Sequence, residues 1–245
     1  SLAVCRAVLR LGGTVTLATD DCNLGVFEQC VKADKELEEY QAVGSLCVHS
    51  FPPLADWADA DTARMDHMAE QSANIIAIER PGPASDGSYY TMRGIDISHL
   101  CAPLDTLFGP REKRTYGTFG IGDGGNEVGM GLVRDLVAQH IPSGELIGCT
   151  ASADILLTSS VSNWGAYAMV AGMEVAGGRK LLPVVEIEQA IASAACEAGA
   201  RDGVTKKKET TVDGFSFEET ARVIKRLRNT VRFHESGCLH PENGT

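Results

Sequence analysis

The sequence predicts an α/β fold, a mostly parallel sheet with helices on both faces, formed as a single domain. Segments of strand character alternate with segments of helical character along the chain. Two of the strand segments, NIIAIE at residues 74–79 and ADILLT at 153–158, are largely apolar runs, as is typical of strands covered on both faces. The turns are short and no linker or repeat interrupts them, so we expect residues 1–245 to form one domain.

The first half of the chain alternates helix and strand three times. The opening helix is closed by Gly12-Gly13, and the charged segment that follows the first strand is typical of a helix with a solvated face. Prolines end the second and third strands, at Pro52-Pro53 and Pro81. The expected helices cover residues 1–11, 24–43 and 61–71, and the expected strands cover 14–19, 45–51 and 74–79.

The second half continues the alternation. Tyr116, Thr118, Phe119 and Ile121 are β-branched or aromatic and predict a strand, and the apolar residues after Val128 have helical spacing. Two short apolar runs predict further strands before three closing helices. The expected strands are 116–121, 146–149 and 153–158, and the expected helices are 128–140, 159–177, 187–198 and 216–233.

A glycine-rich stretch, YGTFGIGDGGNEVGMG at residues 116–131, separates a predicted strand from a predicted helix. Six glycines occur in residues 120–131, and Asp123, Asn126 and Glu127 lie among them. Glycine allows positive φ and lets another group approach the backbone closely. Gly120, Gly122 and Gly125 match a GxGxxG spacing, but acids within the loop would repel a pyrophosphate. The stretch therefore indicates a small-molecule site better than a dinucleotide site.

Polar side chains follow four of the predicted strands. In an open parallel sheet the carboxyl ends of the strands meet at one edge, where ligands bind. We therefore expect the groups after these strands to converge there: Asp20 and Asp21, Glu79 and Arg80, Asp123 with Asn126 and Glu127, and Ser159, Ser160, Ser162 and Asn163.

A carboxylate cluster of this kind has two chemical interpretations. It could hold a hard cation such as Mg²⁺ or Mn²⁺, which prefers oxygen ligands, or neighbouring acids could raise one pKa and form an acid–base pair. A structural alternative is that the acids cap helix N-termini, where negative charge is favoured. Arg93 is a candidate for binding a substrate carboxylate, or else an ordinary loop arginine paired with Asp86 or Asp96.

The composition excludes some partners and indicates others. A net charge of −11 argues against nucleic acid or an anionic membrane surface as the main partner. The eight cysteines, Cys238 included, show no CxxC pair and no metal-type spacing, so reduced thiols in an intracellular compartment are expected. A small-molecule substrate is the expected partner.

Four sequence blocks resemble the C-terminal domain of the mitochondrial D-glutamate cyclase family. They are AIERPGPASDGSYYTMRGIDIS at 77–98, GIGDGGNEVGMG at 120–131, SNWGAYA at 162–168, and DGVT with VDG at 202–205 and 212–214. The resemblance implies conversion of D-glutamate to 5-oxo-D-proline and water in the mitochondrial matrix. It also implies that the family's domain begins upstream of Ser1, with an Asp-Gly-Pro motif, and follows a separate hydro-lyase-like domain.

The chemistry of cyclisation suggests roles for the candidate residues. We expect Glu79, Asp123 and Glu127 to be catalytic, with Glu79 as the base. Asp123 and Glu127, with Asp20, would hold a divalent cation. Substrate would be bound by a set of loop and helix residues, in which Arg93 takes the α-carboxylate: Arg93, Gly124, Gly125, Asn126 and Asn163.

Two other functions remain open from the sequence. The same acids could bind metals in a phosphatase, in which an activated water attacks phosphate. Alternatively, the chain could be a regulatory module that binds a small acid without transforming it.

Overall fold

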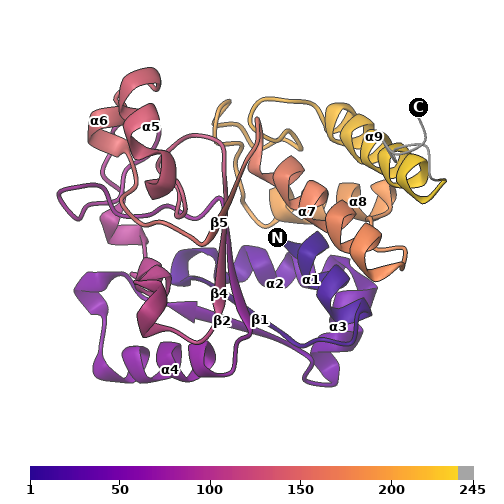
Figure 1. The fold of residues 1–245 in the computed structure, drawn as a ribbon, viewed down its shortest axis with the longest axis horizontal. Coiled ribbons are helices and arrows are strands. Elements are labelled where there is room, and N and C mark those ends of the chain that lie inside the picture. Colours follow the sequence, from indigo (N-terminus) through magenta and orange to yellow (C-terminus); the bar gives the residue numbers. More distant parts are fainter. Residues whose placement is uncertain (237–245) are drawn as a thin grey trace, which may run out of the picture. The chain divides into compact units, whose positions relative to one another are not determined.

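The computed structural model describes residues 1–236 (Figure 1). The chain divides into two compact units. Unit 1 comprises Ser1–Leu17, Gly25–Cys47 and, from the C-terminal stretch, the described residues after Gly165. Unit 2 comprises Ala18–Leu24 and Val48–Gly165. The single domain over residues 1–245 stays a prediction, and Cys238 lies outside the described residues.

Unit 2 contains the parallel sheet. Its strands are β3 (Asn74–Ile78), β4 (Gly117–Gly122) and β5 (Ile155–Thr158), in the order β3-β4-β5. Ile78 pairs with Ile121, and Gly122 pairs with Thr158, both in parallel register. The predicted α/β class with parallel strands is therefore confirmed. The α-helices that lie within this unit are α4 (Asp59–Glu70), α5 (Arg134–His140) and α6 (Gly144–Ile147).

Unit 1 consists largely of helices. A second sheet of two strands, β1 (Val15–Asp20) and β2 (Leu46–Phe51), contributes residues to both units. The helix α7 (Ser162–Gly177) begins in unit 2 and continues in unit 1. The other helices are α1 (Leu2–Arg10), α2 (Leu24–Ala33), α3 (Lys35–Ala42), α8 (Val185–Glu197) and α9 (Phe217–Glu235).

Short 3₁₀ turns connect several of these elements. They cover Asp21–Asn23, Leu54–Asp56, Ser98–Leu100, Leu104–Phe108, Arg111–Lys113 and Gly131–Val133.

Three predicted elements differ in the structure. The helix expected at 24–43 is two helices, α2 and α3, because the Asp34 carboxylate caps the second one. The strand expected at 146–149 is wrong: residues 146–147 end α6 and Cys149 follows the helix, and both Ile147 and Cys149 are fully buried. The helix expected at 128–140 begins only at Arg134, because Val128 and Met130 belong to the buried glycine-rich loop. In the last two places the apolar pattern mixes buried side chains, such as Val128 and Ile147, with exposed ones, such as Leu136 and Leu146, so the pattern does not fix the element type.

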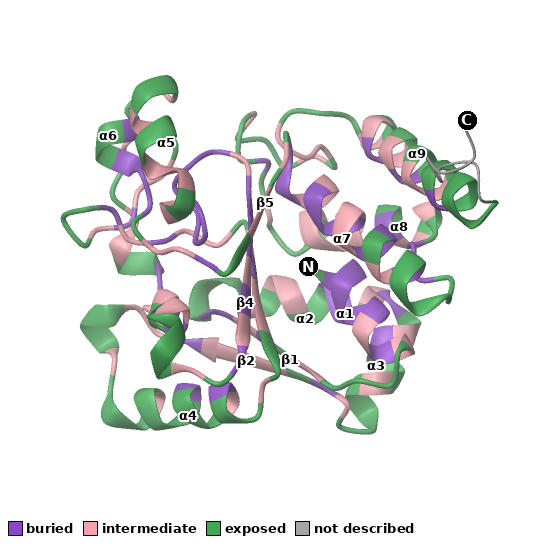
Figure 2. Ribbon diagram, in the orientation of Figure 1, coloured by how far each residue is buried: buried purple, intermediate pink, exposed green. Residues whose placement is uncertain are grey.

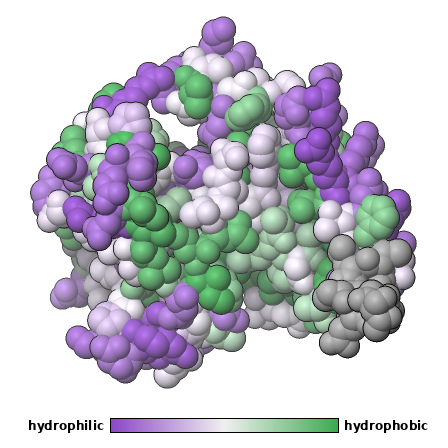
Figure 3. Space-filling view, turned by 45° about the horizontal axis from the view of Figure 1, so that its top comes forward, coloured by the Kyte–Doolittle hydropathy of each residue, from purple (hydrophilic) through white to green (hydrophobic). Residues whose placement is uncertain are grey.

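A hydrophobic core in unit 2 supports the first strands. It contains Phe51, Met65, Ala69, Ala102, Leu104, Leu107 and Tyr116. Helix α4 contributes only Met65 and Ala69 as buried residues, and most of the rest of its surface is exposed (Figure 2). Exposed large apolar side chains also occur in this unit, among them Leu132, Leu136 and Leu146. Figure 3 shows hydrophobic residues interspersed with hydrophilic ones on one face of the molecule.

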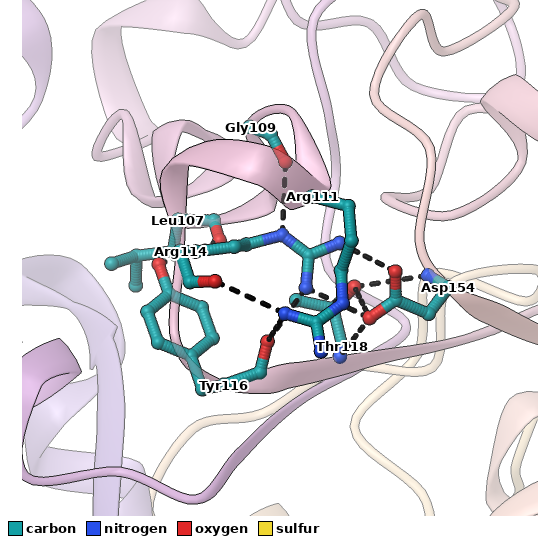
Figure 4. A network of polar contacts seen from close by, with 7 residues as sticks. All are labelled: Leu107, Gly109, Arg111, Arg114, Tyr116, Thr118 and Asp154. Atoms are coloured by element: carbon teal, nitrogen blue, oxygen red, sulfur yellow. Dashed lines mark hydrogen bonds and ion pairs between the residues drawn. The ribbon is translucent and has the colours of Figure 1, made fainter.

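An ion pair between Arg114 and Asp154 joins the N-terminal ends of β4 and β5 (Figure 4). The two Nη atoms of Arg114 donate to the Asp154 carboxylate at 2.8 and 2.7 Å. The backbone N–H of Thr118 donates to the same carboxylate at 2.8 Å, and its hydroxyl accepts from the Asp154 N–H at 3.0 Å. The hydrogen bond from Arg114, followed by that from Thr118, lowers the pKa of Asp154. This network fixes the strand ends opposite the carboxyl edge.

In unit 1 a fully buried arginine joins three helices. Arg6, in α1, is 1% exposed and pairs through its two Nη atoms with Asp34 and Glu188. Asp34 also caps α3 by accepting from the Glu36 N–H at 3.1 Å. The second oxygen of Glu188 accepts from the Tyr167 hydroxyl at 2.8 Å. One cation thus compensates two carboxylates that burial would otherwise penalise.

Another carboxylate in unit 1, that of Asp202, organises the loop after α8. One oxygen of Asp202 accepts from the N–H groups of Val204 and Thr205 at 2.8 and 2.7 Å. The other accepts from the Thr211 hydroxyl at 2.8 Å and from the Gly214 N–H at 2.9 Å. Burial acts to raise the pKa of Asp202, but these four hydrogen bonds outweigh it and lower the pKa to about 2.

Seven cysteines lie among the described residues, and all of them are free thiols. Within the same residues, no helix combines the length and the apolar character that crossing a bilayer requires.

Replacing Arg6 by methionine should lower the free energy of unfolding by about 3–5 kcal/mol, because two buried carboxylates lose their cation. Tyr167→Phe removes one donor to Glu188 and should cost about 1–3 kcal/mol. Urea unfolding measures both. The control is Arg222→Met on the exposed face of α9, which should change stability by less than about 0.5 kcal/mol. Equal urea midpoints for Arg6→Met and Arg222→Met would contradict the role of Arg6 in compensating the two buried carboxylates.

The stabilisation by Asp202 should depend on pH. Its pKa in the folded state, about 2, lies below the ordinary value of 3.8, so the stabilisation is present above pH 3.8 and is lost as the pH falls towards 2. The difference in melting temperature between the wild type and Asp202→Asn should therefore be largest near neutral pH and shrink through that window. A difference that does not change with pH would show that the charge of Asp202 has no part in it.

Candidate active site

The carboxyl ends of β3, β4 and β5 meet at one edge of the sheet, as predicted. The ladder continues past the strands, since the Glu79 N–H donates to the Ile121 carbonyl at 2.9 Å and the Ser159 N–H donates to the Gly122 carbonyl at 3.1 Å. An ion pair between Arg80 and Asp20, with an N–O distance of 2.5 Å, brings the end of β1 to the same edge. Carboxylates therefore follow three strand ends, and those of Glu79 and Asp123 have oxygens within 4.8 Å of each other.

The glycine-rich loop folds around one of its own side chains, Glu127. One carboxylate oxygen accepts from the N–H groups of Asp123 and Gly124 at 3.1 and 2.8 Å, and the other accepts from the Gly125 N–H at 2.7 Å. Glu127 is 3% exposed. Successive backbone N–H groups that point inwards form an anion-binding concavity. Here the bound anion is supplied by the loop itself.

Two of the glycines are required by close packing. Gly125 has a φ of 106°, and a Cβ there would lie 2.5 Å from a methyl carbon of Val137. A Cβ on Gly120 would lie 2.7 Å from the Val128 carbonyl oxygen and from the Gly129 Cα. Side chains at these positions would displace α5 or the backbone of the loop itself, so the glycines explain how tightly the loop is enclosed. A Cβ on Gly124 would lie 2.3 Å from the Met92 sulfur, which can move aside.

The electrostatics of Glu127 reflect this enclosure. Burial raises its pKa above the ordinary value, the three N–H donors lower it in part, and the nearby charge of Asp123 raises it. Both of its oxygens are occupied by backbone donors, so the contacts assign Glu127 a structural role. Its predicted roles as a catalytic residue and a metal ligand stay predictions that these contacts do not support.

Asp123 follows β4 in the chain, and its carboxylate lies at the N-terminus of α7. Its Oδ2 atom accepts from both the N–H and the hydroxyl of Ser162, at 2.7 and 2.8 Å. A carboxylate at a helix N-terminus is stabilised by the exposed N–H groups and the helix dipole. The capping alternative considered from the sequence therefore applies to this residue. The capping contacts also hold its carboxylate in a fixed orientation.

Glu79 faces Asp123 across the edge of the sheet. A carboxylate oxygen of Glu79 lies within 4.8 Å of one of Asp123. Glu79 is exposed and has a φ of 53°, in the left-handed region that non-glycine residues rarely adopt. Two carboxylates at this separation can share a proton or hold a hard cation between them.

Asp20 is used differently from the sequence-based expectation. One oxygen pairs with Arg80, the other accepts from the Ala102 N–H at 2.7 Å, and the residue is 5% exposed. These contacts explain Asp20 as the partner of a buried arginine. Its role as a metal ligand stays a prediction. A carboxylate of this unit that has an oxygen within 4.8 Å of one of Asp123 is that of Glu79.

Of the predicted substrate-binding residues, some are engaged in contacts within the protein and others are exposed or half-buried. The N–H groups of Gly124 and Gly125 point at Glu127, so they are not available to a substrate in this conformation. The Asn126 side-chain amide donates to the Tyr90 carbonyl at 2.7 Å and so anchors the 84–98 loop, which carries the exposed Arg93. Asn163 is half-buried in the first turn of α7, beside Ser162.

Sequence reasoning missed the roles of two residues at this site. It placed Ser162 at this edge but gave it no role, yet Ser162 orients Asp123; its place at the start of a helical segment was the available signal. Met92 packs on Gly124, and nothing in the local pattern indicated that contact.

Glu127→Gln should destabilise the chain by about 1–3 kcal/mol, because the new amide NH₂ would face a backbone N–H that loses its acceptor. Glu174 provides the matched control, since it is also buried but a single oxygen accepts both of its bonds, from the N–H groups of Leu181 and Leu182. Glutamine can keep both of those bonds. Chemical unfolding should therefore show a clearly larger loss for Glu127→Gln, and equal losses would contradict this description of the loop.

Comparison with known proteins agrees with the resemblance in the sequence. Residues 1–228 match the family model "D-glutamate cyclase-like, C-terminal". The chain is 34% identical over 194 residues to the human protein named "D-glutamate cyclase, mitochondrial". That alignment covers 69% of this chain and 30% of the human protein, so the chain spans less than a third of that relative. This chain belongs to the family of D-glutamate cyclase-like C-terminal domains.

Proposed function

We propose that this domain converts D-glutamate to 5-oxo-D-proline with loss of water. The family and the name of the human relative support the reaction class. The observation that carries the proposal is the pair of facing carboxylates, Glu79 and Asp123, within 4.8 Å of each other at the ligand-binding edge of the sheet.

The reaction requires two changes in the substrate. The α-ammonium group must lose a proton before its nitrogen can attack, and the γ-carboxylate must become electrophilic. The nitrogen then forms a bond to the carbon of the γ-carboxyl group, and one oxygen of that group leaves as water after accepting two protons. A base for the ammonium and an acid for the departing oxygen supply these steps.

The two carboxylates fit these roles in different ways. Glu79 is exposed, so its carboxylate can accept the ammonium proton. Asp123 is held by Ser162 and would present its other oxygen to the γ-carboxyl group. A substrate carboxylate beside two protein carboxylates would bring three negative charges together, so the site requires a shared proton or a cation. Glu79 and Asp123 would hold a divalent cation, which would polarise the γ-carboxyl group.

Arg93 would bind the α-carboxylate of the substrate. It lies on the 84–98 loop, which Asn126 and Met92 attach to the glycine-rich loop. A guanidinium group binds a carboxylate by two parallel hydrogen bonds. Placing the α-carboxylate at this loop would direct the γ-carboxyl group towards the edge of the sheet.

The proposal extends to the location and the partners of the domain. The human relative is named as mitochondrial, and we assign this domain to the mitochondrial matrix. The net charge of −11 favours a small-molecule substrate over nucleic acid or an anionic membrane.

Chiral chromatography of the chain incubated with D-glutamate tests the activity, with L-glutamate as the stereochemical control. Glu79→Gln and Asp123→Asn should each lower kcat by about 10²–10⁴-fold, the usual contribution of a general acid or base. Glu70→Gln, an exposed acid at the end of α4, should leave the rate unchanged. Adding EDTA or Mn²⁺ distinguishes a shared proton from a cation.

Three results would overturn parts of the proposal. Near-normal rates in both variants would remove the assigned roles of Glu79 and Asp123. Hydrolysis of a phosphomonoester that needs Mn²⁺, without lactam formation, would favour a metal-dependent phosphatase. Binding of D-glutamate without turnover would favour a small-acid-binding module.

A further inference from the structure

The backbone conformation of Glu79 is the starting point. Its φ of 53° lies in the left-handed region, which costs free energy for any residue with a Cβ. Glutamate has no local preference for this region of the kind that asparagine and aspartate have. Strained residues persist only where the surroundings enforce them, and they cluster at functional sites.

The surrounding hydrogen bonds show why the backbone turns at this residue. The Glu79 N–H still pairs with Ile121 of β4, at 2.9 Å. The next carbonyl, that of Arg80, instead accepts from the Val128 N–H at 2.8 Å, and the Gly82 N–H donates to the Asn126 carbonyl at 2.9 Å. The chain therefore changes its pairing partner from β4 to the glycine-rich loop within a single residue.

The Arg80 side chain is fixed in place beyond this turn. It is 15% exposed, its Nη1 donates to Asp20 at 2.5 Å, and its Nη2 donates to the Ala102 carbonyl at 2.6 Å. Asp20 also accepts from the Ala102 N–H at 2.7 Å, which closes a ring of three contacts. An arginine held at both ends of its guanidinium group has little freedom to rotate.

We propose that the buried Asp20–Arg80 ion pair is a positioning device, which holds Glu79 in the left-handed conformation with its carboxylate facing Asp123. The ion pair fixes the residue after Glu79, and the β-ladder fixes the residue before it. If the ion pair were lost, the backbone of Glu79 would relax to negative φ and its side chain would turn away from Asp123. Asp20 and Arg80 thus act on the reaction through Glu79. The catalytic part of this inference rests on the proposed function.

A thermodynamic cycle tests the conformational part without any activity measurement. Glu79→Gly and Glu79→Ala both remove the carboxylate, so their difference reports the backbone. If residue 79 had a negative φ, the glycine variant would be the less stable of the two, because its unfolded chain has more conformational entropy. At a φ of 53° the glycine variant should instead be the more stable one. Its equilibrium constant for unfolding should be about threefold or more smaller than that of the alanine variant.

The same comparison is then made in an Asp20→Asn background, which keeps the shape of the side chain and removes its charge. If the ion pair enforces the strain, alanine should become as stable as glycine or more so. The matched control is Asp154→Asn, which breaks the Arg114–Asp154 pair at the opposite strand ends of the same unit. In that background glycine should remain favoured. A glycine preference that persists in Asp20→Asn overturns the proposal.

Activity provides the second readout. Asp20→Asn and Arg80→Met should lower kcat for lactam formation at least tenfold with little change in KM, and Arg80→Lys should restore part of the loss. Asp154→Asn should keep the wild-type kcat. A wild-type chain that forms no 5-oxo-D-proline would overturn the proposed function and the catalytic part of this inference, while the cycle would still decide the conformational part. Wild-type kcat in folded Asp20→Asn would overturn the positioning role.

Discussion

The carboxylate of Glu127 is the interaction on which the rest of the site depends. Three consecutive N–H groups, from Asp123 to Gly125, point into the interior, where an unpaired donor costs free energy. Because the carboxylate satisfies all three, the chain can reverse direction directly after a buried strand. Each residue from Gly124 to Met130 is buried. Without that internal anion the loop would need water or a ligand in its place.

This internal anion changes what a glycine-rich loop after a strand can do. In nucleotide-binding proteins such a loop leaves its N–H groups open to a phosphate. Here the donors are already used, so recognition falls to the side chains at the rim of the loop. Asp123 is oriented by Ser162, and the 84–98 loop is attached through Asn126. The loop thus serves as a rigid support for the site, and the groups that it carries meet the ligand.

The sequence predicted the fold more fully than it predicted the site. Apolar runs and the glycines after Ile121 were sufficient to predict β3, β4 and β5 and the edge at which their ends meet. The same patterns failed at residues 146–149 and at Val128, since an apolar residue there is buried in some positions and exposed in others and does not distinguish a helix turn from a strand or a loop. The roles of the acids were harder to predict. Asp20, Glu127 and Asp123 are all acids that closely follow a strand in the sequence. Their roles differ only through the hydrogen-bond donor that each carboxylate contacts.

The strain at Glu79 lay beyond prediction for a related reason. Backbone bonds to two different partners, β4 and residues 126–128, lie on either side of it, and no local preference of glutamate encodes its φ. Four carboxylates approach this edge of the sheet, and the fold neutralises them in different ways. Arg80 compensates Asp20, and backbone donors enclose Glu127. The cap on α7 uses one oxygen of Asp123, and a carboxylate oxygen of Glu79 lies within 4.8 Å of an oxygen of the same group. Compensation of Asp20 and Glu127 within the fold thus offsets part of the negative charge at this edge, where the carboxylates of Glu79 and Asp123 face each other.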